Sequence, residues 1–149
     1  MTTYESDVKT ISSSGEVVFN QLSKLSNFSN LQNMNAEAQA KLNEMLKDVE
    51  FDDDSCRFSV EGIGKVGFRI TEREPFKTIK LEAENSPIAV NGWIQLVQVA
   101  ENDTRMKLTL KADMPMMIKM MADSKLKKGI NMIADALVQF LSMKTAKYI

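Results

Sequence analysis

Few side chains in this sequence have the chemistry that catalysis near neutral pH usually needs. The 149 residues contain no histidine, which excludes a Ser-His-Asp triad, a Cys-His pair and a histidine-ligated zinc or haem iron. Cys56 is the single cysteine, so an intramolecular disulfide and a metal site of several cysteines are also excluded. We therefore predict no catalytic residue, no metal site and no cofactor.

Two charged clusters and one glycine pair are weaker candidates, and each is more typical of a solvated turn. Asp52–Asp54 lacks the spaced ligands and the glycine of a calcium loop. The carboxylates within Glu72–Glu74 adjoin Pro75, whereas acid–base pairs need burial or proximity that separates their pKa values. Gly62–Gly64 lacks the third glycine of a dinucleotide-binding loop, so we do not expect a nucleotide there.

Methionine is in clear excess, with 11 residues, and five of them lie between residues 114 and 121. Flexible thioethers fill irregular cores, but they also suit surfaces that adapt to varied shapes. Two interpretations stay open for this segment. Its methionines either fill the core or form a gate at the mouth of a pocket.

Charge is unevenly distributed, although the net charge is only −1. Residues 1–104 carry 10 Lys/Arg and 17 Asp/Glu, whereas residues 105–149 carry 9 and 3. An acidic body facing a basic C-terminal helix explains this pattern, and recruitment to anionic lipid is the alternative. Nucleic acid is not expected, because no aromatic residues are interleaved with the basic ones. Transient membrane contact stays open, without stable insertion.

Length and composition predict one cytoplasmic domain over residues 1–149, as a monomer or a homodimer. No stretch reaches the roughly 18 consecutive apolar residues of a membrane-spanning helix. The first seven residues lack the basic and apolar regions of a signal peptide. A single cysteine fits a reducing compartment.

The hydrophobic pattern predicts a strand and then two short helices in the first third of the chain. Residues 3–11 alternate as in a half-exposed strand. Ser13 and Glu16 have the spacing of a capping box, which predicts a helix that ends at the asparagine-rich segment 27–35. Residues 36–47 are rich in helix formers and predict the second helix.

From residue 48 the apolar period changes to two and favours about six strands in an antiparallel meander. The alternation is clearest over 56–60, 66–70, 79–83, 88–99 and 106–112. Pro115 then begins an amphipathic helix that runs to about Lys144.

A helix lying on such a sheet gives two inward sets of side chains. The sheet set is Tyr4, Val8, Cys56, Phe58, Val60, Val66, Phe68, Ile70, Ile79, Leu81, Met106, Leu108 and Leu110. The helix set is Ile118, Met121, Leu126, Ile130, Ile133 and Leu137. Nearly all are apolar, so any cavity between them is apolar, with few polar anchors. Close packing of these chains is the alternative.

The strand around Trp93 can face either way. We prefer Ile94 and Leu96 inward, which places Trp93 on the outer face as a candidate dimer contact. Either orientation turns one of Gln95 and Gln98 inward as a polar handle.

The element order, the length and the long C-terminal helix entered through Asp113-Met-Pro115 resemble the START and birch-pollen-allergen (SRPBCC, polyketide cyclase-like) superfamily. The run from Ile70 to Glu82 is similar to a hairpin that many members place in mid-sheet. The resemblance implies an α+β helix-grip fold. In that fold a curved antiparallel sheet of about seven strands wraps a long C-terminal helix, with two short helices after strand 1.

Members of this superfamily often hold an apolar molecule between sheet and helix, so the resemblance implies binding or carrying of a lipid-, sterol- or polyketide-like ligand. The alternatives are a cyclase or dehydratase acting on an apolar substrate, and a chaperone-activator-like interaction module. The absence of histidine makes an enzyme the weaker reading. The expected ligand-binding residues are Tyr4, Phe58, Phe68, Ile70, Leu81, Leu96, Leu108, Met117 and Met121.

Overall fold

The computed structural model describes residues 2–27, 40, 47–60, 64–86 and 88–146. The elements are β1 (Thr2–Glu5), β2 (Lys9–Ile11), α1 (Gly15–Leu22), β3 (Lys47–Phe51), β4 (Ser55–Val60), β5 (Gly64–Glu74), β6 (Thr78–Glu84), β7 (Val90–Ala100), β8 (Asp103–Ala112) and α3 (Met116–Ala146). The helix predicted over residues 36–47 lies outside the described residues, except for Ala40 and Lys47.

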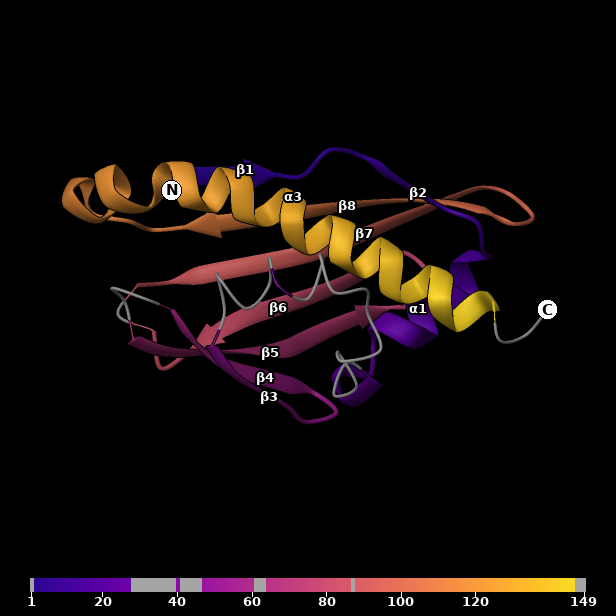
Figure 1. Ribbon diagram of the computed structural model, residues 1–149, viewed down its shortest axis with the longest axis horizontal. Coiled ribbons are helices and arrows are strands. Elements are labelled where there is room, and N and C mark those ends of the chain that lie inside the picture. The colour runs from indigo at the N-terminus through magenta and orange to yellow at the C-terminus, as the bar shows by residue number, and fades with distance from the viewer. Residues whose placement is uncertain (1, 28–39, 41–46, 61–63, 87, 147–149) are drawn as a thin grey trace.

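The strands form one antiparallel sheet in the order β1-β8-β7-β6-β5-β4-β3, and β2 also pairs with β8. α3 crosses one face of the curved sheet, and α1 lies near the C-terminal end of α3 (Figure 1). The α+β helix-grip prediction is confirmed. We call the end of the sheet where the chain enters α3 at Met116 the entry end. The opposite end, next to α1, is the α1 end.

A β-bulge breaks the N-terminal strand and reverses the facing of its second half. The register against β8 gains one residue between Glu5 and Lys9. The amide and the hydroxyl of Ser6 both hydrogen-bond to the backbone of β8 at 2.9 Å, which holds the break in place. The prediction that Val8 faces inward is therefore wrong. Val8 is 62% exposed, and Ile11 is buried instead.

The first helix is capped one residue later than predicted. Ser14, not Ser13, is the N-cap, and its hydroxyl accepts a hydrogen bond from the Val17 amide at 3.3 Å. Ser13 is buried, and its carbonyl oxygen accepts a 2.7 Å hydrogen bond from the hydroxyl of Thr104. Because this bond anchors Ser13 to β8, capping passes to the next serine.

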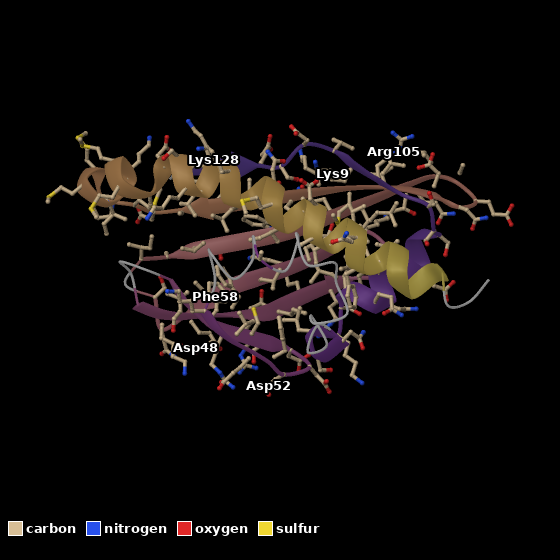
Figure 2. The ribbon with its side chains drawn as sticks, viewed as in Figure 1. Lys9, Asp48, Asp52, Phe58, Arg105 and Lys128 are labelled. Carbon is tan, nitrogen blue, oxygen red and sulfur yellow. The ribbon has the colours of Figure 1, made fainter. Side chains whose placement is uncertain are left out.

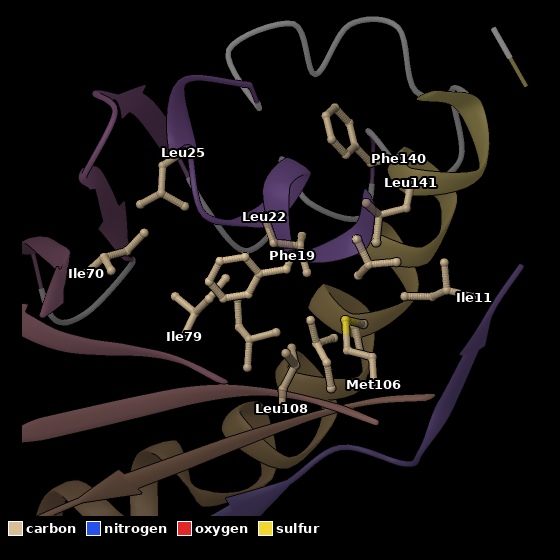
Figure 3. Close-up of a cluster of buried hydrophobic side chains, with 14 of the residues drawn as sticks. Ile11, Phe19, Leu22, Leu25, Ile70, Ile79, Met106, Leu108, Phe140 and Leu141 are labelled. Atoms are coloured by element: carbon tan, nitrogen blue, oxygen red, sulfur yellow. The ribbon is translucent and has the colours of Figure 1, made fainter. Parts of the chain in front are cut away.

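The described hydrophobic core is concentrated at the α1 end, where α1, the C-terminal half of α3 and the inner face of the sheet meet (Figure 3). Phe19 is 6% exposed, and Leu22, Ile79, Met106 and Leu141 are each fully buried. Protein interiors close-pack, so side chains fill the grip at this end.

α3 buries a narrow stripe that passes through Ala122, Ile130 and Ala134. Leu126, Ile133 and Leu137 pack against the core beside it, as predicted, and Ile118 is half-buried. The prediction that Met121 faces inward is wrong, because its side chain is 74% exposed. Successive residues of a helix are rotated by about 100°, which carries Met121 off the stripe that Ala122 occupies.

The preferred orientation of β7 is confirmed. Ile94 and Leu96 are buried at 9% and 4% exposure. Trp93 lies on the outer face, where the ammonium groups of Lys80 and Lys111 sit 5.9 and 5.6 Å from its ring centroid. The indole is therefore flanked by two cations.

Candidate functional site

Toward the entry end, several apolar side chains on the inner face of the sheet are only half-buried, although Val66 and Ala112 are buried. Phe58 on β4 and Phe68 on β5 stack with ring centroids 6.0 Å apart, and neither belongs to the described core cluster. Leu81 on β6 and Leu110 on β8 are half-buried at the margin of that cluster. Figure 2 places Phe58 on the half of the sheet nearer the start of α3. The described residues thus leave an apolar surface incompletely covered.

Gly92 is a position without a side chain in the middle of this surface. It is paired with Leu81 on one neighbouring strand and Leu110 on the other, and it shares the inward face with Ile94. A β-carbon built at Gly92 would meet the Thr109 carbonyl oxygen at 3.8 Å and a methyl group of Leu110 at 4.0 Å, which is ordinary van der Waals contact. A β-carbon would therefore fit at Gly92, although the residue itself is buried, so no steric clash requires glycine here.

A buried phenol ties the first strand to the first half of α3. The Tyr4 hydroxyl donates a 2.7 Å hydrogen bond to Oδ1 of Asp123, and the other Asp123 oxygen accepts from Lys127 at 3.1 Å. Burial and the neighbouring carboxylate raise the pKa of Tyr4 to about 12. Hydrogen bonds from Tyr4 and Lys127 hold the pKa of Asp123 below its usual range.

We expect Tyr4→Phe to lower the melting temperature by about 4 °C at pH 7, because it removes a hydrogen bond to a charged carboxylate. The lowered pKa of Asp123 means that this stabilisation is present above about pH 4 and is lost as the pH falls through the folded-state value. Thermal unfolding of both proteins, followed by circular dichroism at pH 7 and pH 3, measures this. An equal difference at both pH values would contradict a bond to the ionised carboxylate.

The other polar side chains considered for the inner face, Cys56 and the two glutamines of β7, add no charge to it. Cys56 is half-buried, and burial raises the pKa of its thiol to about 11, so it is protonated at neutral pH. Gln98 has the inward orientation but lies at the α1 end, where its side-chain oxygen accepts from the Gly15 amide at 2.9 Å. Gln95 lies on the outer face and accepts from the Thr109 hydroxyl at 2.8 Å. Gln98, the inward glutamine that was predicted as a polar contact for a ligand, therefore holds α1 against the sheet by a hydrogen bond.

The residues expected to bind a ligand fall into three groups. Tyr4, Ile70, Leu96 and Leu108 are buried members of the core cluster, each less than 9% exposed. Phe58, Phe68 and Leu81 are half-buried toward the entry end. Met117 and Met121 form the third group, whose side chains are 79% and 74% exposed. Gly92 and Asp123 were missed, because neither an isolated glycine nor an aspartate on a helix carries a distinctive sequence signal.

A more polar pocket of about 490 Å³ lies at the turn between β3 and β4, lined by Ser26, Phe51, Asp52, Asp53, Asp54, Ser55 and Arg69. The aspartates that line this pocket already accept hydrogen bonds from other side chains of the protein. Asp53 accepts from the Ser26 hydroxyl, and Asp54 accepts from Arg73. Arg73 also donates to the Ser23 carbonyl oxygen at the end of α1 (2.8 Å), a contact that the sequence did not indicate. Among the described residues, no group of three or more metal-binding side chains occurs.

No model of a known protein family matches the sequence, and a search of curated proteins gives no match. Solved structures do match over almost the whole chain. Norcoclaurine synthase from Thalictrum flavum, as a point mutant with a transition-state analogue, superposes with a TM-score of 0.72 at 9% identity and covers 97% of this chain and 96% of its own. A START superfamily protein from Mycobacterium smegmatis gives 0.58 at 15% identity over 95% and 97% of the two chains. A protein from Deinococcus radiodurans gives 0.56 at 19% identity over 96% and 97%.

These likenesses place the architecture in one class. The chain has the helix-grip fold of the START and birch-pollen-allergen superfamily. In the part of the chain that the structure describes, no helix is long and apolar enough to cross a membrane.

Proposed function

We propose that the chain binds or carries a small, largely apolar molecule at the entry end, between the inner face of the sheet and the first half of α3. The observation that carries this proposal is the contrast along β6. Ile79 is fully buried at the α1 end, whereas Leu81 is half-buried two residues further along and lies beside Gly92. Side chains pack fully around the first position, whereas the second is partly exposed, which supports placing the ligand beside it.

The proposed ligand lies against the Phe58–Phe68 pair and Leu81, over a floor that includes Tyr4, Ile70, Leu96 and Leu108. Burial of apolar surface contributes about 25 cal/mol per Å². A ligand that buries roughly 300 Å² would gain about 7 kcal/mol before the entropic cost of binding is subtracted. Met117 and Met121 are not part of this proposed contact surface, because their side chains are exposed to solvent.

The polar groups nearby favour a ligand without a buried charge. Tyr4 and Cys56 have pKa values of about 12 and 11, so both are neutral at pH 7. A buried ion without a partner is costly, which favours lipid-, sterol- or polyketide-like molecules with only a few hydrogen-bonding groups. In support of a small-molecule ligand in general, a norcoclaurine synthase of the same fold has been solved in complex with dopamine and hydroxybenzaldehyde.

An enzyme of cyclase or dehydratase type receives less support from the same groups. A general acid at pH 7 works best with a pKa near neutrality. The pKa of Asp123 is lowered and those of Tyr4 and Cys56 are raised, so all three move away from neutrality.

Two measurements test the binding proposal. Protein purified from its own host is extracted with organic solvent and the extract is analysed by mass spectrometry, and we expect an apolar molecule in near-stoichiometric amount. The delipidated protein is titrated with 1-anilinonaphthalene-8-sulfonate at pH 7, and we expect saturable fluorescence that the extract displaces. An empty extract together with no saturable dye binding would overturn the proposal.

A further inference from the structure

The first turns of α3 expose an unusual amount of apolar surface. Met116, Met117, Met120 and Met121 are 78%, 79%, 79% and 74% exposed. We call these four residues the methionine tip. Figure 2 shows sulfur atoms gathered where α3 begins, at the extremity of the molecule. At about 100° per residue the four side chains span an arc of about 140°, nearly opposite the buried stripe of α3. The methionine tip therefore faces solvent.

Basic side chains border the methionine tip. Residues 116–128 contain Lys119, Lys125, Lys127 and Lys128 against one acidic residue, Asp123, which gives a net charge of +3. Asp123 is already engaged by Tyr4 and Lys127. Lys128 lies within the arc of the methionine tip, about 10 Å further along the helix axis than Met121, and Lys125 lies at its margin.

We propose that the methionine tip and the neighbouring lysines dock the protein on the surface of an anionic membrane. The thioether side chains would enter the boundary between headgroups and acyl chains, about 5–10 Å deep. Lys125 and Lys128 would then lie at the level of the lipid phosphates, where each lysine near an anionic leaflet strengthens binding about fivefold. The inference concerns where the protein docks, so it does not depend on the ligand proposed above.

A second copy of the chain is a less suitable occupant of this surface. Four methionine side chains offer at most a few hundred Å², below the roughly 800 Å² per partner that stable interfaces bury. Pairing two such tips would also bring two segments of charge +3 together. An anionic surface neutralises that charge, so charge complementarity favours the membrane.

Co-sedimentation with vesicles tests this docking. The wild type is expected to bind vesicles with about 30% phosphatidylserine in phosphatidylcholine at least tenfold more tightly than pure phosphatidylcholine vesicles, and to dissociate at high salt. Replacing all four tip residues by serine (Met116→Ser, Met117→Ser, Met120→Ser and Met121→Ser) is expected to abolish binding. Lys125→Gln with Lys128→Gln is expected to weaken binding about 25-fold, at fivefold per lysine.

Control variants change exposed residues elsewhere on the protein. Val97→Ser with Val99→Ser removes two exposed apolar side chains of β7, and Lys24→Gln with Lys77→Gln removes two exposed charges at the α1 end. Both double variants are expected to bind vesicles as the wild type does. Equal binding to both vesicle types, or unchanged binding by the serine variant, would overturn the inference. So would a concentration-dependent dimer in analytical ultracentrifugation that the serine variant abolishes, because it would assign the methionine tip to a second copy.

Discussion

A leucine in place of Gly92 is expected to weaken binding of the apolar ligand at least tenfold while the protein remains folded. The new β-carbon has 3.8 Å or more to its nearest neighbours, so the strand accepts it without a clash. The rest of the side chain projects between Leu81 and Leu110 into the space proposed for the ligand. Titration of the delipidated variant with 1-anilinonaphthalene-8-sulfonate measures the loss, and urea denaturation measures stability.

The matched control for this substitution is Asn91→Leu. Asn91 is the preceding residue on β7, so its side chain points to the outer face of the sheet. It adds a leucine on the same strand without entering the grip, and it should leave dye binding unchanged. The Gly92 variant also tests the space itself. A loss of more than about 2 kcal/mol in its free energy of unfolding would mean that side chains already fill the gap, which contradicts the binding proposal.

Truncating Ile79 to alanine is expected to lower the free energy of unfolding by about 3 kcal/mol. The side chain is fully buried, so its removal costs both transfer free energy and a cavity. Leu81→Ala, on the same strand and the same face, is expected to cost only about 1 kcal/mol, because Leu81 is half-buried.

Urea denaturation of the two alanine variants and the wild type provides this comparison. Both variants remove aliphatic carbons from one face of β6, so the difference between them reports how closely each end of the grip is packed. Equal losses would mean that packing is uniform along the strand, and the contrast on which the ligand site depends would disappear.

The strands and the long helix followed from periodicity because alternation of apolar residues reports a sheet with one buried face. The alternation predicts the wrong face of the sheet where a bulge inserts one extra residue into a strand. The bulge at Ser6 turns Val8 outward and Ile11 inward, and nothing in residues 3–11 indicates it, because its bonds lie on the distant strand β8. The prediction for Met121 fails because its side chain lies about 100° around the helix from that of Ala122, which occupies the buried stripe.

The candidate site was only partly predictable. Apolar inward residues such as Phe58, Phe68 and Leu81 are found from alternation alone. The proposed ligand position also depends on Gly92, whose place between Leu81 and Leu110 appears only from the strand pairing. Cation–indole contacts on the outer face and the Arg73 link to α1 likewise join residues that are remote in sequence.

The bond from Tyr4 to Asp123 spans 119 residues, and among the described strands β1 and β2 pair with β8, far along the sequence. The hairpins from β3 to β8 need only short loops, whereas these terminal pairings must close very long ones before they gain any contact energy. We therefore expect the meander to form first and the N-terminal strand to dock late. On the ribosome, the apolar inner face would remain uncovered until α3 has emerged, so nascent chains are most prone to aggregation before α3 is released.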